Sequence, residues 1–280
     1  MTSPHSLPAP FNFGLFSASA APKRRALFLD YDGTLAAFHV DRWKAVPSAE
    51  MLSLLIQLSS IKNSRVALVS GRTVQDLRAL LGDAVRIEMW GDYGWERWRP
   101  DGSTTIWNAP KQDAVIFMEA AAMAAPYVDR QHLEFKTASV AIHTRALPDT
   151  ARNEVSAVIT RLWSQLATQN GLELLPFNGG FELRDILRTK GTAVHELCDE
   201  LDPNTHVSYI GDDIADEDAF VSITESGWSI LVADARRLSH AQYCMRPGRD
   251  VMRFLKSWIQ WDGGSHATDL FSQQRTSRLA

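Results

Sequence analysis

Short apolar runs alternate with amphipathic segments through the first hundred residues. Apolar runs at residues 26–29, 66–69 and 87–90 predict three buried strands. Between them, apolar positions at helical spacing predict helices over residues 48–58 and 73–81. This strand–helix order is typical of a parallel sheet covered by helices.

The middle of the chain has a different pattern, in which each of two helices is followed by two strands. The helices are predicted over residues 112–125 and 148–168, and the strands over residues 133–136, 140–144, 172–177 and 181–184. The strand–helix alternation then returns, from a helix over residues 191–200 to a last helix over residues 250–261. The sequence therefore predicts an α/β protein, with a Rossmann-like parallel-sheet core and an inserted α+β cap domain.

These patterns also predict the domain boundaries. We expect the core over residues 23–108 and 185–262, and the cap over residues 109–184. Residues 1–22 are rich in Ser, Ala and Pro and predict a disordered N-terminal arm, while residues 263–280 predict a loose polar tail.

Composition and charge exclude some classes of partner. The net charge is −4 and the isoelectric point about 6.1, so no general basic surface is expected for nucleic acid. The chain has no Lys or Arg before Lys23 and no apolar run of membrane-spanning length, so we expect no membrane partner and a cytoplasmic location. We also expect a monomer.

Acidic residues follow the first predicted strand. In the segment Asp30-Tyr31-Asp32-Gly33-Thr34, alternation along an extended chain places Asp30 and Asp32 on the same side. One carboxylate can then attack as a nucleophile while the other moves a proton. A plain surface turn is the alternative, but the buried strand before it favours a site at the carboxyl end of the sheet.

Polar and basic residues also follow the second predicted strand. Ser70, Gly71 and Arg72 lie there, where a hydroxyl and backbone N–H groups can bind an anion; a helix N-cap is the alternative.

A lysine stands at the start of a later helix. Lys190 begins a helix, where the helix dipole opposes a positive charge, so a paired role with Asp30 or Asp32 and a phosphate is more plausible than a free lysine.

A dense acidic segment follows the strand that ends at Gly211. Five acids fall between residues 212 and 218, and they repel one another unless a cation neutralises them or several face water. Oxygen ligands without Cys or a nearby His favour Mg²⁺. A solvated acidic helix start is the alternative, and the position after a strand favours the metal.

Taken in order, these motifs resemble those of haloacid-dehalogenase-like phosphatases, over residues 26–220. The resemblance implies Asp30 as nucleophile, Asp32 as acid and base, Ser70, Gly71 and Lys190 around the phosphate, and Mg²⁺ as the cofactor. It also implies a metal site whose members are Asp30, Asp32 through its backbone carbonyl, Asp212 and Asp213, with Asp216 in the surrounding shell.

Within this superfamily, the chain resembles trehalose-6-phosphate phosphatases. The segments 69–72 and 211–220, Glu134-Phe135-Lys136 and Phe181-Glu182-Leu183-Arg184 carry that likeness. It implies that the partner is a small sugar phosphate, that Arg72 binds the substrate, and that the sugar is bound by cap residues Glu134, Lys136, Arg145 and Glu182. The chain departs from the usual family pattern at Tyr93, where His is common, and at Asp185, where Pro is common.

Three alternatives remain open from the sequence. Glu134, Lys136 and Arg145 could be cross-strand charge pairs on an exposed sheet face. The substrate could be another sugar phosphate, such as sucrose phosphate or a glycosyl-phosphoglycerate. The chain could also be a catalytically silent regulatory domain, although every expected catalytic residue is present.

Overall fold

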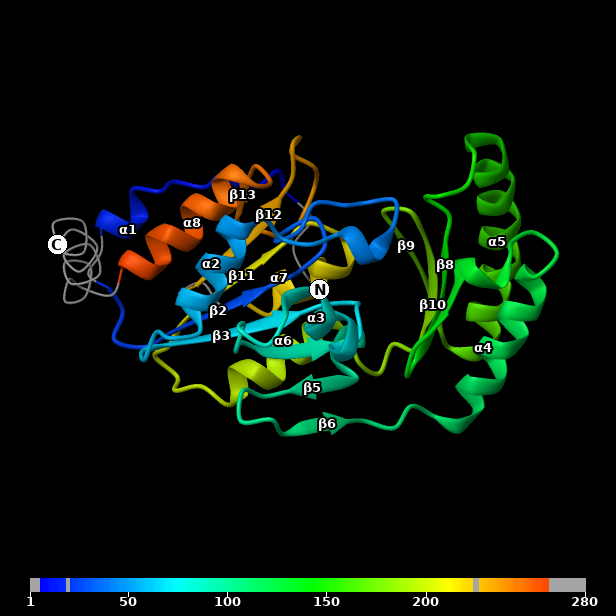
Figure 1. The fold of residues 1–280 in the computed structure, drawn as a ribbon, viewed down its shortest axis with the longest axis horizontal. Coiled ribbons are helices and arrows are strands. Elements are labelled where there is room, and N and C mark those ends of the chain that lie inside the picture. The colour runs from blue at the N-terminus through cyan, green and yellow to red at the C-terminus, as the bar shows by residue number, and fades with distance from the viewer. Residues whose placement is uncertain (1–5, 19–20, 224–226, 262–280) are drawn as a thin grey trace, which may run out of the picture.

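The computed structural model describes residues 6–18, 21–223 and 227–261, which contain two sheets in two lobes (Figure 1). In the larger sheet the strands follow the order β1-β13-β12-β11-β2-β3-β4-β5-β6. The strands from β13 to β4 are parallel, whereas β5 and β6 add an antiparallel edge. Their bounds are β1 Ala9–Pro10, β2 Arg25–Leu29, β3 Ser64–Val69, β4 Glu88–Gly91, β5 Glu96–Trp98, β6 Thr104–Ile106, β11 His206–Gly211, β12 Trp228–Val232 and β13 Tyr243–Met245.

Helices cover both faces of this sheet, because its central strands are apolar on both sides. Leu27 and Leu29 of β2 pack on one face with α2, α3 and α8, whereas Ala26 and Phe28 pack on the other with α6 and α7. The helix bounds are α1 Leu15–Ala18, α2 Ala49–Leu58, α3 Val74–Leu81, α6 Lys190–Asp199, α7 Glu217–Val221 and α8 Arg249–Gln260. Short 3₁₀ turns, η1 Arg42–Lys44, η2 Asp92–Gly94 and η4 Ile214–Asp216, lie in the loops.

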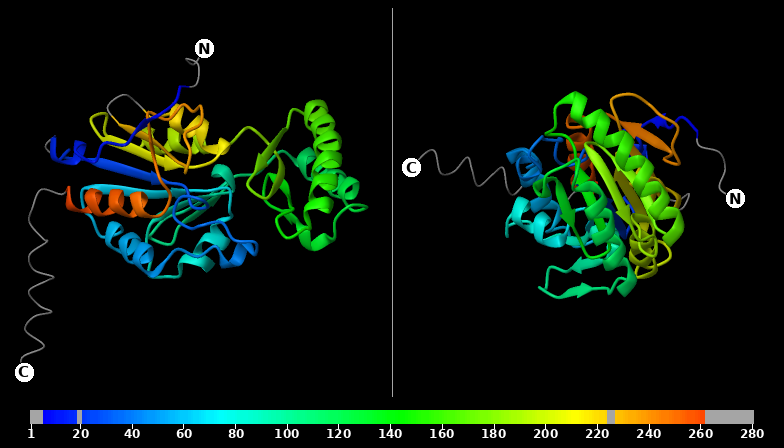
Figure 2. Two further views of the ribbon diagram at one scale, coloured as in Figure 1. Left: turned by 90° about the horizontal axis from the view of Figure 1, so that it is seen from above. Right: turned by 90° about the vertical axis from the view of Figure 1, so that its right-hand side faces the viewer.

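The second lobe is inserted between β6 and α6. Its antiparallel sheet has the order β7-β8-β10-β9, with bounds β7 Leu133–Phe135, β8 Ser139–His143, β9 Glu173–Phe177 and β10 Gly180–Arg184. Helices α4 (Lys111–Ala124) and α5 (Asp149–Asn170) cover the face of this sheet that points away from the core (Figure 2). The other face is turned toward the carboxyl ends of the core strands.

The predicted fold class is therefore confirmed, but the prediction of a disordered arm is wrong for residues 6–18. Strand β1 pairs with β13, and Phe11 is 7% exposed. The Phe11 ring lies 5.4 Å from that of Trp228 and 5.2 Å from that of Phe254. Burial of this aromatic surface offsets the entropy of ordering a short segment. Residues 1–5, 19–20 and the predicted tail lie outside the described residues.

The structure also bears on membrane association. Among the helices of the described ranges, none has the length and apolar character needed to cross a bilayer.

Candidate active site

Three adjacent strands of the core end at the same edge and place their polar residues together. Asp30 follows β2, Ser70 follows β3, and Asp212 follows β11, and these strands are neighbours in the sheet. A single cavity between the lobes is lined by the candidate core residues Asp30, Asp32, Ser70, Gly71, Arg72, Lys190, Asp212 and Asp213 and by the candidate cap residues Glu134, Lys136, Arg145 and Glu182. Asp216, the other candidate, is fully buried beside this cavity.

A buried lysine connects two of the carboxylates. The Nζ of Lys190 lies 2.7 Å from Asp30 Oδ1 and 2.7 Å from Asp216 Oδ1. Burial alone would lower the pKa of Lys190, but the two carboxylates outweigh it and raise that pKa above its usual value. Lys190 is the first residue of α6, whose N-cap is Thr189, so this ion pair compensates for the unfavourable position in the helix dipole.

Asp216 organises the acidic loop. Besides Lys190, it accepts hydrogen bonds from the Tyr209 hydroxyl at 2.6 Å, from the Asp212 backbone N–H at 3.0 Å and from the Asp213 backbone N–H at 2.9 Å. Gly211 makes this possible, because a Cβ there would overlap the Asp216 carboxylate. Asp216 thus fixes the loop that carries Asp212.

Three carboxylates come close enough to share one cation. Oxygens of Asp30, Asp212 and Asp216 all lie within 4.8 Å of one another. Burial raises the pKa of Asp30 to about 7, and burial next to Asp30 raises the pKa of Asp212 to about 10. Within the described residues, the buried Asp212 Oδ1 has no hydrogen-bond donor. These carboxylates repel one another, and one of their buried oxygens has no hydrogen-bond donor. Carboxylate oxygens are the ligands that Mg²⁺ prefers, so the group fits this cation.

This carboxylate group shares Asp30 and Asp212 with the predicted metal site, whose full set of ligands stays a prediction. Asp216 already accepts four hydrogen bonds, which suits the surrounding shell expected for it, and the Asp213 side chain accepts a hydrogen bond from Ile214 N at 2.7 Å and caps η4. The Asp32 side chain pairs with Arg72, whereas the atom expected at the metal is the Asp32 backbone oxygen. An acidic sequence segment does not reveal which carboxylates its local turns will use as caps.

Arg72 holds Asp32 rather than pointing freely into the cavity. Its Nε lies 2.6 Å from Asp32 Oδ2 and its Nη2 2.8 Å from Asp32 Oδ1, in a bidentate pair. The same Nη2 donates to the backbone oxygen of Arg42 at 3.0 Å. Arg72 therefore fixes the orientation of the predicted acid and base.

Part of the anion-binding site predicted after β3 is already used by contacts within the protein. Helix α3 begins only at Val74, with Thr73 as its N-cap, and the Val74 N–H donates to Glu96 Oε2 at 2.7 Å. The start of this helix is therefore already neutralised by a carboxylate. Ser70 is 1% exposed and lines the cavity, where its hydroxyl can still donate to an anion.

The cap sheet presents its polar face to the core. Glu134 on β7, Ala141 on β8 and Glu182 on β10 lie in one row across the strands. Lys136 Nζ bridges the lobes, with Glu182 Oε1 at 2.6 Å and the backbone oxygen of Gly71 at 2.8 Å. The Lys136 and Glu182 side chains are 5% and 2% exposed, so they are not charge pairs on an exposed sheet face.

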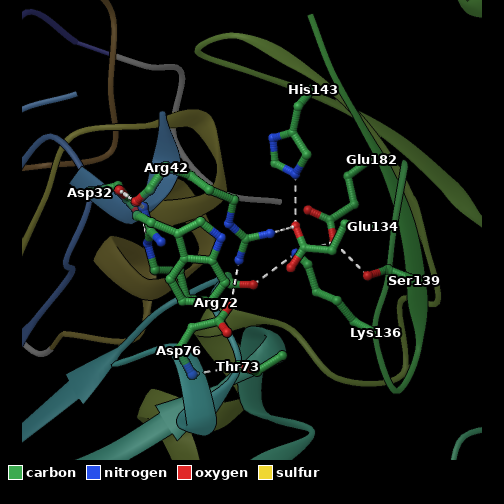
Figure 3. Close-up of polar contacts among 12 residues, drawn as sticks. Asp32, Arg42, Arg72, Thr73, Asp76, Glu134, Lys136, Ser139, His143 and Glu182 are labelled. Carbon is green, nitrogen blue, oxygen red and sulfur yellow. Dashed lines mark hydrogen bonds and ion pairs between the residues drawn. The ribbon is translucent and has the colours of Figure 1, made fainter. Parts of the chain in front are cut away.

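A second group of contacts surrounds Glu134 (Figure 3). Its carboxylate pairs with the guanidinium of Arg42 from the core and lies 2.7 Å from His143 Nε2. Burial would raise the pKa of Glu134, but these partners and Lys136 outweigh it and lower that pKa. Arg145 reaches from the cap to the backbone oxygen of His39 at 2.7 Å. Each of the four cap candidates thus contacts a residue of the core, Glu182 doing so through the Tyr93 hydroxyl.

Sequence reasoning missed Arg42 as a residue of this cavity and missed the contacts of Tyr93. Arg42 lies in a polar loop, and its guanidinium pairs with Asp76 as well as Glu134. Tyr93 was noted only as a departure from a family pattern, yet its hydroxyl donates to Glu182 at 2.8 Å. Neither loop carries a periodic signal that predicts such contacts.

The family match and the related proteins agree with one another. Residues 28–243 match the trehalose-phosphatase family. The chain is 31% identical over 232 residues to a bifunctional trehalose-6-phosphate synthase/phosphatase of Thermoproteus tenax, covering 80% of this chain and 31% of that protein. It is 30% identical over 246 residues to a trehalose-phosphate phosphatase of Mycobacterium marinum, covering 82% of this chain and 60% of that protein. The chain thus spans between about a third and three-fifths of these relatives.

Solved structures share the fold at low sequence identity. The C-terminal domain of the C. albicans trehalose-6-phosphate phosphatase superposes with a TM-score of 0.79 at 20% identity, covering 92% of this chain and 99% of that chain. The C-terminal domain of a Candida albicans trehalose synthase regulatory protein has a TM-score of 0.61 at 15% identity, covering 89% and 99%. The same fold therefore occurs in a domain described as a phosphatase and in a domain described as part of a regulatory protein.

Proposed function

Because the chain belongs to the trehalose-phosphatase family, we propose that it hydrolyses trehalose 6-phosphate to trehalose and phosphate, with Mg²⁺ as the cofactor. The observation that carries this proposal is the convergence of Asp30, Lys190 and Asp212 at one end of a cavity whose other end is lined by polar cap residues. A phosphate can lie at the core end and a sugar at the cap end.

The core residues would carry out a double displacement. An oxygen of Asp30 attacks phosphorus, the bond from phosphorus to the sugar oxygen breaks, and Asp32 gives that oxygen a proton. Water then attacks the aspartyl phosphate, Asp32 takes the proton, and phosphate leaves. Asp32 accepts two hydrogen bonds from Arg72, which leave it about two acceptor positions where it can carry the proton.

Positive charge must accompany these steps, because a carboxylate approaches a phosphate of like charge. Lys190 supplies one such charge at Asp30 and also keeps that side chain in place. The carboxylates of Asp30 and Asp212, braced by Asp216, would hold Mg²⁺, which supplies further charge neutralisation for the phosphate when bound. The Ser70 hydroxyl would donate to a phosphate oxygen.

The cap residues would bind the sugar. Glu134, Lys136 and Glu182 present charged groups into a cavity with little exposure to water, where each hydrogen bond to a hydroxyl is favourable. Arg145 lies at the rim, between the two lobes. Substrate would replace part of the contacts that these residues now make with each other and with the core.

The test is a comparison of phosphate release from several phosphorylated sugars in the presence of Mg²⁺. We expect trehalose 6-phosphate to be preferred over sucrose 6-phosphate and glucosyl-phosphoglycerate. The Asp30→Asn variant should keep the fold by circular dichroism and lose turnover. A strong preference for another sugar phosphate would refute the substrate, and retained turnover in Asp30→Asn would refute the nucleophile.

A catalytically silent regulatory domain would give a different outcome. Such a chain would release phosphate neither from any sugar phosphate nor from p-nitrophenyl phosphate, a small substrate that does not need the cap. The presence of Asp30, Asp32 and Lys190 in the lining of one cavity argues against this alternative.

A further inference from the structure

The corner between β4 and β5 has an unusual backbone at the boundary between the lobes. Asp92 and Tyr93 have φ angles of 46° and 55°, in the left-handed region that residues other than glycine rarely adopt. Backbone hydrogen bonds hold this corner to the phosphate end of the site: Asp92 N donates to Arg72 O at 2.8 Å, and Tyr93 N to Ser70 O at 3.0 Å. Strain of this kind persists where the surroundings enforce it, and it is concentrated at functional sites.

The corner aims the Tyr93 ring at the cap. The ring passes directly over Gly71, where a Cβ would lie 2.7 Å from the Tyr93 hydroxyl. On the cap side, the Arg184 guanidinium lies 4.5 Å from the ring centroid, and Leu175 packs with Tyr93 in a small apolar cluster. Tyr93 therefore contacts both the phosphate loop and the cap sheet.

The Tyr93 hydroxyl completes the hydrogen bonding of a cap carboxylate. Glu182 Oε1 accepts from Lys136 Nζ at 2.6 Å and from the Ser139 hydroxyl at 2.5 Å. Glu182 Oε2 accepts from the Tyr93 hydroxyl at 2.8 Å. A carboxylate has about four acceptor positions, so one remains, and it lies on the oxygen that Tyr93 holds.

The Tyr93 hydroxyl is suited to act as a hydrogen-bond donor at every working pH. Tyr93 is 6% exposed, and burial together with the negative charge of Glu182 raises its pKa well above the usual value. The hydroxyl therefore keeps its proton, and its hydrogen bond to Glu182 persists across the pH range in which the enzyme would work.

We propose that Tyr93 is a positioning residue, which orients Glu182 so that its remaining acceptor position receives a sugar hydroxyl of the substrate. This inference rests on the sugar-phosphatase function proposed above and names the residue of the core that sets sugar recognition in the cap. Because phosphate is bound by other residues, Tyr93 acts on sugar binding and not on phosphoryl transfer.

The test compares the Tyr93→Phe variant with the wild-type chain on two substrates, trehalose 6-phosphate and p-nitrophenyl phosphate. We expect the KM for trehalose 6-phosphate to rise about tenfold, as for loss of one hydrogen bond to a charged group, with kcat changed less than about twofold. Both constants for p-nitrophenyl phosphate should stay at the wild-type values. Tyr127→Phe, at a 40% exposed tyrosine outside the cavity, is the matched control and should change neither substrate.

Two results would overturn the inference. An unchanged KM for the sugar phosphate would show that Glu182 does not need Tyr93, and an equal loss on both substrates would show a merely structural role. The wild-type chain separately tests the proposed function: if it prefers another sugar phosphate, the comparison is made with that substrate. If it hydrolyses no sugar phosphate, both the function and the role of Tyr93 are refuted.

Discussion

Replacement of Lys190 by Met tests how far the buried acidic cluster depends on positive charge. The methionine side chain has a similar length and removes only the ammonium group, whose Nζ lies 2.7 Å from both Asp30 Oδ1 and Asp216 Oδ1. At an effective dielectric constant of about 20, each contact is worth about 6 kcal/mol before desolvation. Burial of the charges offsets much of this, and removal of one partner from a buried ion pair costs about 3–5 kcal/mol.

We therefore expect the free energy of unfolding of Lys190→Met to fall by about 3–5 kcal/mol, measured by urea denaturation. Mg²⁺ in excess should stabilise the variant more than the wild type, because the like charge of the lysine no longer opposes the metal. Phosphate release should fall at least about 100-fold, since Asp30 and the phosphate then approach without the ammonium.

A surface lysine provides the control for this experiment. Lys256 pairs with Glu50 at 2.5 Å, but its side chain is 50% exposed, so Lys256→Met should cost less than about 1 kcal/mol. Wild-type stability or turnover in Lys190→Met would refute the electrostatic reasoning. Equal stabilisation of variant and wild type by Mg²⁺ would refute the placement of the metal beside the lysine.

Three further predictions concern the loops and the metal. Gly33→Ala should lower turnover at least about tenfold, because a Cβ at this φ of +77° would overlap the Asp212 carboxylate. Gly102→Ala, with a φ of +90° and nothing near its Cβ, should cost about 1–2 kcal/mol of stability from its φ alone and keep normal turnover. Burial raises the pKa of Asp92 to about 7 from 3.8, so its folded form keeps a proton that the unfolded chain loses, and stability falls as pH rises from about 4 to about 7. Urea denaturation at several pH values should show a fall that is smaller in Asp92→Asn than in the wild type by up to about 4 kcal/mol, because Asp30 and Asp212 also have raised pKa values and keep their own contribution. Equal slopes in the two proteins would contradict this prediction. Chelation by EDTA should stop phosphate release and lower the thermal midpoint, both reversed by Mg²⁺; activity that survives full chelation would exclude a metal-dependent reaction.

The elements that bring the core residues together could be predicted from the sequence. The strands before Asp30 and Ser70 end in unbroken apolar runs, and Val207, Tyr209 and Ile210 make the strand before Asp212 largely apolar. Parallel strands end at one edge, so the polar residues that follow them must meet. The cap elements were predictable for a similar reason, because their apolar positions follow regular periods.

Contacts between the lobes could not be predicted in this way. The left-handed conformation of Tyr93 depends on backbone bonds to Ser70 and Arg72, which are set by tertiary packing and not by local propensity. The pair between Arg42 and Glu134 depends on how the cap sits against the core. Strands β5 and β6 have three residues each, too few for an alternating pattern to be recognised.

The short β1 strand also determines how far the N-terminus of this protein can be truncated. It covers the outer edge of β13, and Phe11 behind it seals the aromatic surface of Trp228 and Phe254. A shortened chain that starts at residue 23, as the composition of the first residues invites, would leave unpaired backbone groups beside bare aromatic rings. Such open edges recruit strands from neighbouring molecules, so that truncation would aggregate during purification even with every catalytic group intact.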